Sequence, residues 1–399
     1  MREIRLKSKK LPRTVYLLGL TSFLNDSSSE MIHPLLPGFL SKVLGAGPAA
    51  IGLIEGIAES TASVVKLGSG LLSDRFRRKK PLIVAGYAIA GCVRPLYGLA
   101  GSWPLALAFR FADRFGKGLR SSPRDAMLAA AAPAGQRGAA FGLHQTMDHA
   151  GAVVGPLIAT LLMAGFGLGL KEVFLWAAVP AALVLIVMIF LVKEAPRRAA
   201  PRLRSSALRP ASLRSVLGQG RFRLFLAAVL VFTLANSSDA FILLKLSDAG
   251  VPVSWLGGLW ALHHLVKIAS TYTGGQLSDR LGRKPLLIAG WSLYGLVYGG
   301  LAFASSSSVC MALFLAYGLY HGLAEPVEKA LVADLAPAAG RGAAFGLYHM
   351  TVGLGALPAS LVFGLLWNTW GSAAAFLSGG VLALVAALLL TRLKLEGSS

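Results

Sequence analysis

Long runs of apolar residues alternate with short polar segments along the chain. A helix of about 20 apolar residues is long enough to cross the hydrocarbon core of a bilayer. Runs of this kind occupy residues 14–40, 49–72, 81–101, 103–130, 139–163, 172–193, 222–246, 252–277, 285–304, 307–334, 342–368 and 371–391. The pattern therefore predicts an all-α integral membrane protein with twelve transmembrane helices.

A longer polar segment separates the sixth run from the seventh. It is rich in Arg, Pro and Ser and includes the stretch APRRAAPRLR. Such a composition is typical of a linker. We therefore expect an N-terminal half of six helices over residues 1–193, a basic cytoplasmic linker over 194–220, and a C-terminal half of six helices over 221–399.

The two halves repeat each other. GSGLLSDRFRRKKPLIVAGY at 68–87 matches TGGQLSDRLGRKPLLIAGW at 273–291, and APAGQRGAAFGLHQTM at 132–147 matches APAAGRGAAFGLYHM at 336–350. The order and orientation are the same in both halves, which indicates parallel repeats about an axis along the membrane normal. Repeats of this kind place a binding site near the middle of the membrane, between the halves.

The composition agrees with a membrane protein. Hydrophobic residues make up 55% of the chain and charged residues 14%, whereas soluble domains carry about 25% charged residues. Most of the 39 Lys and Arg residues, which give a net charge of +21, lie in alternate polar segments and at the termini. This is the positive-inside pattern, so we expect both termini in the cytoplasm. The basic excess is thus a topology signal, and we expect no nucleic-acid partner.

A motif of glycines and charges occurs once in each half, after the second and the eighth apolar run. Its pattern is G-x-L-[SA]-D-R-x-G-R-[RK]; residues 275–284 fit it in full, and residues 70–79 depart from it only where Arg77 replaces a glycine. On this motif and the repeat, the chain resembles transporters of the major facilitator superfamily over its whole length. The resemblance implies two pseudo-symmetric six-helix halves, alternating access and a monomer.

The motif suggests a gate at the cytoplasmic edge of the membrane. A glycine lets a neighbouring helix approach closely, and an Asp can pair with an Arg or with the N-terminus of a helix. Such contacts can form in one state of a transporter and break in the other. The residues assigned to this gate are Gly70, Asp74, Arg75, Arg78, Gly275, Asp279, Arg280 and Arg283. The alternative is that Asp74 and Arg75 are solvated loop charges.

Charged residues inside the apolar runs are candidates for proton coupling, because charges in a bilayer usually face a cavity or a partner. Asp26, Glu30 and His33 share one helical face. Two carboxylates a turn apart favour one that holds a proton near neutral pH. Arg110 matches, by position, an arginine that assists proton coupling in related drug:proton antiporters, and Asp113 lies on the same face. We assign Asp26, Glu30, Arg110 and Asp113 to proton coupling.

Other polar residues in the runs are candidates for lining a substrate path. They are Asn25, His33, Glu59, Asp148, Asn236, Asp239, Tyr317 and His321. The alternative for several of them is a wetted helix end or a permanent packing pair, such as His144 with Asp148. All seven histidines lie in or beside predicted spans, which raises the possibility of a metal path, yet no H-x-x-x-H or Met-rich pattern is present.

These features favour a secondary transporter, specifically a proton-coupled exporter of a small molecule in a bacterial inner membrane. GAVVGP at 151–156 partly resembles an antiporter motif and favours export. The alternatives are a nickel-type efflux transporter for divalent transition metals, and a sensor on the same fold that transports nothing. The partners would be the substrate, protons and the lipid bilayer. No Ser-His-Asp set, HExxH, phosphate loop or CxxC pair is present, so we expect neither an enzyme nor a cofactor.

Overall fold

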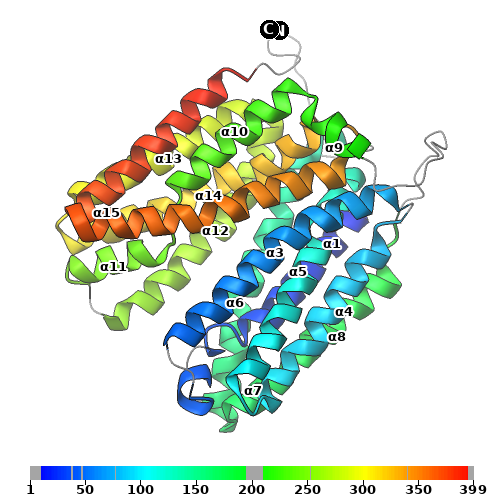
Figure 1. The fold of residues 1–399 in the computed structure, drawn as a ribbon, viewed down its shortest axis with the longest axis vertical. Helices are drawn as coiled ribbons and strands as arrows, with labels where there is room; N and C mark the ends of the chain where they lie inside the picture. The colour runs from blue at the N-terminus through cyan, green and yellow to red at the C-terminus, as the bar shows by residue number, and fades with distance from the viewer. Residues whose placement is uncertain are drawn as a thin grey trace.

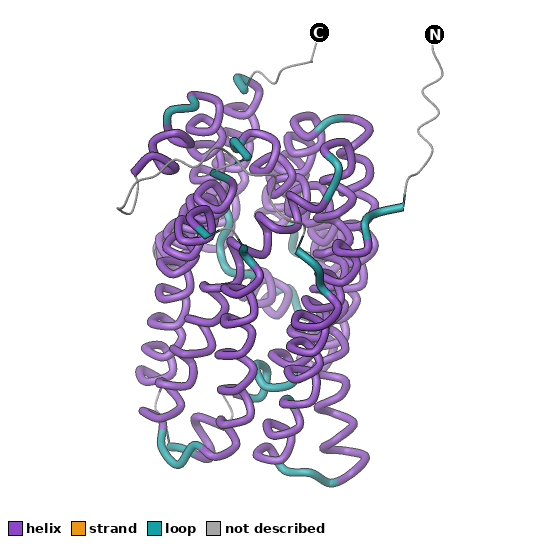
Figure 2. Tube along the Cα trace, turned by 90° about the vertical axis from the view of Figure 1, so that its right-hand side faces the viewer, coloured by secondary structure: helices purple, strands orange, loops and turns teal. Residues whose placement is uncertain are grey.

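A computed structural model of the chain describes residues 10–36, 39–45, 48–76, 78–194, 210–251, 253–338 and 340–393. Within these residues the regular structure is helical, as Figure 2 shows. The N-terminal half contains α1 (Arg13–Glu30), η1 (Phe39–Val43), α3 (Pro48–Arg75), α4 (Lys80–Leu96), η2 (Tyr97–Leu99), α5 (Trp103–Ala131), η3 (Ala134–Gln136), α6 (Arg137–Phe166), α7 (Leu170–Trp176), α8 (Ala178–Ile186) and η4 (Val187–Leu191).

The C-terminal half lies beside the N-terminal half in Figure 1. It contains α10 (Gly220–Ala235), α11 (Ala240–Asp248), α12 (Val253–Leu281), α13 (Arg283–Phe303), α14 (Ser307–Leu335) and α15 (Arg341–Thr391), and α9 (Pro210–Leu217) precedes it. A kink at Gly371, whose positive φ of 85° suits glycine, divides α15 into two spans. The twelve predicted spans are therefore present among the described residues, and the all-α fold is confirmed.

Two predicted spans are interrupted, and the prediction of continuous helices there is wrong. The first helix ends at Glu30 rather than near residue 40, because Pro34 has no N–H to donate to the Glu30 carbonyl and its ring crowds that carbonyl. The run at 222–246 breaks between Ala235 and Ala240. Asn, Ser and Asp occupy that break, and their side chains compete with helical backbone hydrogen bonds. The short helix α9 lies within the predicted linker, whose boundaries stay a prediction.

Six of the described helical segments are long and apolar enough to cross a membrane by length and composition alone. Others, such as α1, α3, α5 and α12, carry charged residues within their spans. Charge is tolerated there because these helices pack against other helices of the bundle. Polar groups in the interior thus come both from these helices and from clear spans such as α4, α6 and α14.

Contact between the halves depends on glycines at one end of the molecule. We call this the linker end: it is where α1 begins, where α3 and α12 end, and where α6 and α15 begin. There α3 packs against α15 and α12 against α6. A Cβ on Gly70 would clash with the Gly342 carbonyl oxygen, and one on Gly275 with the Gly138 carbonyl oxygen. The missing side chains let these backbones touch.

A methyl group at Gly70 should weaken this contact. We expect Gly70→Ala to lower the free energy of unfolding by about 1–3 kcal/mol, the usual range for overpacking. Gly68 is the matched control, because a Cβ there meets nothing within 4 Å; Gly68→Ala should be neutral or slightly stabilising. Thermal unfolding of the purified variants compares the two. Equal melting temperatures for both variants would contradict the packing account.

Candidate functional site

Two aspartates at the linker end hold the halves together. The Asp74 carboxylate accepts hydrogen bonds from the backbone N–H groups of Gly342 at 2.9 Å and Ala343 at 2.7 Å, at the start of α15. Asp279 accepts the equivalent bonds from Gly138 at 3.0 Å and Ala139 at 2.7 Å, at the start of α6. A helix N-terminus favours an anion because its first N–H groups lack intrahelical partners. Each half therefore binds a helix end of the other.

Basic residues reinforce these contacts unequally. Arg283 contacts Asp279 and also donates to Asp334 at 3.1 Å, while Arg137 crosses from α6 to the same Asp334 at 2.5 Å. In the other repeat, Lys79 lies 3.5 Å from Asp74, and Ala130 occupies the position that matches Asp334. The remaining arginines of the motif, Arg75, Arg78 and Arg280, are exposed.

A carboxyl pair lies between α1 and α6 in the N-terminal half. The side chains of Asp26 and Asp148 lie close enough to interact directly, and a proton shared between them would relieve the repulsion of two carboxylates. The Asn25 amide donates to Asp26 at 2.7 Å, and the Ser22 hydroxyl donates to Asp148. Gly151 lets the two helices approach, since a Cβ there would lie 3.0 Å from the Asp26 Cβ. Packing by a small residue thus brings two acids together.

Arg94 organises the buried polar groups beside this pair. Its guanidinium donates to Asp113 at 3.0 Å and to the Asn25 carbonyl and side-chain oxygens at 3.0 and 3.1 Å. All three residues are at most 5% exposed. Arg110, one helical turn from Asp113, lies 3.3 Å from the His33 ring. Sequence reasoning missed Arg94, because a single arginine in an apolar run carries no pattern.

The break between α10 and α11 positions the polar residues of the C-terminal half. Tyr317 donates to Asp239 at 2.8 Å, and the Lys267 amine lies 4.0 Å from the same carboxylate. Tyr294 donates to the Ala235 carbonyl oxygen at 3.0 Å, which satisfies an acceptor at the end of α10. The irregular segment therefore lies among aromatic and charged side chains, and Tyr294 hydrogen-bonds its backbone.

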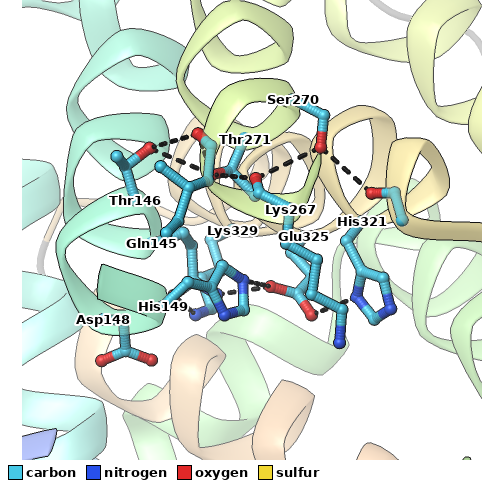
Figure 3. A network of polar contacts seen from close by, with 12 residues as sticks. Gln145, Thr146, Asp148, His149, Lys267, Ser270, Thr271, His321, Glu325 and Lys329 are labelled. Carbon is cyan, nitrogen blue, oxygen red and sulfur yellow. Dashed lines mark hydrogen bonds and ion pairs between the residues drawn. The ribbon is translucent and has the colours of Figure 1, made fainter. Parts of the chain in front are cut away.

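A polar network crosses between the halves around Glu325, as Figure 3 shows. Glu325 receives hydrogen bonds from Gln145 of α6 at 2.5 Å and from His321 of α14 at 2.8 Å. His149 of α6 lies 3.4 Å away, and Lys329 donates to the other end of the Gln145 side chain at 2.7 Å. The sequence predicted His321 as a residue that lines the substrate path. It did not indicate that Gln145, Glu325 and Lys329 form one hydrogen-bonded group.

A second contact between the halves lies at the matching place in the repeat. His349 of α15 aligns with Gln145, and Asp125 of α5 aligns with Lys329. The His349 ring is 2.8 Å from the Asp125 carboxylate, which also pairs with Arg124 at 2.9 Å. The two repeats thus make the same kind of contact with different chemistry.

The structure differs from several expectations based on the sequence. His144 does not hydrogen-bond Asp148: neither ring nitrogen has a hydrogen-bond partner among the described residues, and Asp148 turns toward Ser22 and Asp26. Glu30 receives a contact from Ser29 at 3.5 Å, and Asn236 one from Tyr294 at 3.5 Å. The side chain of Glu59 lies outside the described residues. In the part of the chain that is described, no three His, Cys, Asp or Glu side chains are arranged to hold a metal ion.

Comparison with known proteins decides the family. The sequence profile of the Major Facilitator Superfamily matches residues 18–265 and 247–398. The chain belongs to the Major Facilitator Superfamily. It is therefore a multi-pass membrane protein and a secondary transporter, not an enzyme.

Individual relatives of this transporter agree with that family. An uncharacterised MFS-type transporter of Methanocaldococcus jannaschii is 35% identical over 96% of this chain and 95% of its own length. The multi-drug resistance efflux pump PmrA of Streptococcus pneumoniae is 26% identical over 84% of each chain. The human organic anion transporter MFSD10 (TETRAN) has a similar fold, with a TM-score of 0.80 over 95% of this chain and 100% of that one, at 17% identity.

The Arg94–Asp113 pair should be essential for folding of the transporter. We expect Arg94→Met to cost about 3–5 kcal/mol, because it leaves a buried carboxylate without its ion-pair partner. Replacing both groups, as Arg94→Met with Asp113→Leu, should recover most of the loss, since the desolvated charges are then gone. Thermal unfolding in detergent measures both variants. A double variant as unstable as Arg94→Met alone would contradict this.

Proposed function

We propose that this transporter is a proton-coupled exporter of a small organic molecule. The observation that carries the proposal is the Asp26–Asp148 pair. Two carboxyl groups this close can share one proton, because like charges at such a distance cannot both ionise readily. Release of that proton leaves two anions that repel each other, so the pair can link proton binding to a movement of α1 against α6.

The neighbouring acid Asp113 has a different part in this proposal. Arg94 already neutralises it in the buried network, so we assign it to the support of Asn25 and the carboxyl pair. Arg110 and His33 lie on the next turn of that network. Glu30 lies one turn beyond Asp26 and is partly exposed, which suits a residue that passes protons toward the pair.

The aspartates of the repeated motif form the gate in this proposal. Both bind helix ends across the interface at the linker end, together with Arg137 and Asp334. The halves would separate there when these bonds break, while the substrate residues Asp239, Tyr317 and His321 become accessible from that end. Export is supported by the efflux pump named among the relatives and by GAVVGP in α6. Location in a bacterial inner membrane with cytoplasmic termini stays a prediction.

Transport assays test proton coupling. In proteoliposomes with an acidic interior, we expect one substrate class to collapse the pH gradient, tested with lipophilic cations, antibiotics, organic anions and divalent Ni, Co, Zn and Fe. Asp26→Asn and Asp148→Asn should each abolish the collapse, because an amide cannot exchange the shared proton. Asp248→Asn, at an exposed site on α11, is the control and should retain activity.

Each outcome has a definite meaning. Normal coupling in both carboxyl-pair variants would overturn the role of Asp26 and Asp148. No response to any class would contradict export of a broad range of molecules and would favour a sensor. A response to a metal ion alone would overturn the organic substrate in favour of metal efflux.

Loss of a motif aspartate should open the linker end. Spin labels on the exposed residues Phe76 and Leu281, in a background with Cys92→Ser and Cys310→Ala, report the distance between the halves. We expect Asp74→Asn and Asp279→Asn to raise the open population several-fold, because an amide oxygen accepts fewer of the helix N–H bonds, each worth about 1 kcal/mol. Distances unchanged from the Asp248→Asn control would contradict the gate.

A further inference from the structure

A side chain of the N-terminal half lies between an acidic and a basic residue of α14. Glu325 and Lys329 are spaced i and i+4, the arrangement in which Glu and Lys pair on a helix. Among the described contacts they form no ion pair with each other. The Gln145 amide lies between them instead, with its Nε2 donating to Glu325 at 2.5 Å and its Oε1 accepting from Lys329 at 2.7 Å (Figure 3).

The chemistry of this insertion is specific to an amide. A carboxylate only accepts hydrogen bonds and an ammonium group only donates them. A primary amide offers one end to each, so one neutral side chain satisfies both charges. Gln145 is held in place because α6 lies close to α12: a Cβ on Gly142 would be 2.6 Å from the Thr271 carbonyl oxygen, and Thr146 lies 3.0 Å from the Thr271 hydroxyl.

We propose that Gln145 is a positioning residue whose contacts depend on the state of the transporter. It separates Glu325 from Lys329 only while the linker end is closed. When the halves part there, the amide leaves with α6, and Glu325 and Lys329 close into a direct ion pair on α14. The proposal rests on the alternating movement proposed above. Glu325 and Lys329 then each have a partner in both states, so opening leaves no uncompensated charge inside the membrane.

In the matching contact of the other repeat, the interface acid also has a basic partner within its own half. Asp125 binds His349 of the opposite half, and it already pairs with Arg124 of its own half. Separation of the halves removes His349 and leaves Arg124 in place. Glu325 likewise loses Gln145 and His149 but keeps His321, and Lys329 becomes its new partner. Each interface acid therefore has a base within its own half.

The labelled protein described above tests this inference. Gln145→Met keeps the volume of the side chain but removes both hydrogen bonds, so the closed state loses them while the open state keeps its ion pair. We expect the ratio of open to closed protein to rise about tenfold, because the closed state loses two hydrogen bonds of modest net strength. Adding Lys329→Met should then lower that ratio at least about threefold, because it removes the ion pair of the open state.

A matched control separates this from simple loosening of the interface. Thr146→Val removes a neighbouring contact between the halves without touching the amide. In the Thr146→Val background, adding Lys329→Met should change the ratio of open to closed protein by the same factor as Lys329→Met does in the unmodified protein. It should not restore the closed state as it does in the Gln145→Met background. Labels on Phe166 and Phe303, at the opposite end, should show the reciprocal change.

The outcomes distinguish this inference from the proposed function. Two populated states with no shift in Gln145→Met would overturn the positioning role and leave alternating access intact. A shift that Lys329→Met does not reverse would overturn the ion pair of the open state. A single distance distribution under all conditions, with transport intact, would overturn the rocking movement and this inference with it.

Discussion

The structure depends on the attraction between a carboxylate and the N-terminus of a helix in the opposite half. Asp74 and Asp279 each bind two backbone N–H groups that the helix itself leaves unpaired. The direction of these bonds fixes where α6 and α15 begin relative to the other half. The glycines then allow those helices to lie against α12 and α3. Gln145 and His349, two turns further along, reach across the interface only because these starts are held.

A second constraint is that a charge inside a membrane needs a partner. Asp113 has Arg94, Asp125 has Arg124, and Asp239 has Tyr317 and Lys267. These pairs stay within one half, so movement of one half against the other does not break them. The hydrogen bonds of Asp26 and Asp148 come from the neutral side chains of Asn25 and Ser22, and the two acids lie against each other. In the proposed function a shared proton removes one of the two negative charges of this pair, whereas the other buried acids are balanced by a fixed hydrogen-bond or ion-pair partner.

Much of the fold could be predicted from the sequence, because lipid demands long apolar helices and the halves repeat. The two aspartates that bind helix ends could also be named, since the motif repeats at a fixed spacing; their role as a gate stays a prediction. The broken spans could not, because Pro34 and the polar residues after Ala235 lie within runs that remain apolar on average. Arg94 and Gln145 could not be found either. A single charge or a neutral amide shows its role only when residues distant in sequence meet.

The repeats preserve backbone geometry while changing charge. The sequence Arg124–Asp125 of one half aligns with Glu328–Lys329 of the other, and each pair lies on the helix that meets α15 or α6 across the interface. The Glu328 carboxylate is bound by Trp291 and Tyr348 within its own half, where the first repeat has Tyr87 and His144. Equal geometry would let the halves move symmetrically in the proposed alternating access. Unequal charge places the carboxyl pair in one half and the aromatic, histidine-rich surroundings in the other. In the proposed function, the proton and the substrate therefore need not compete for the same side chains.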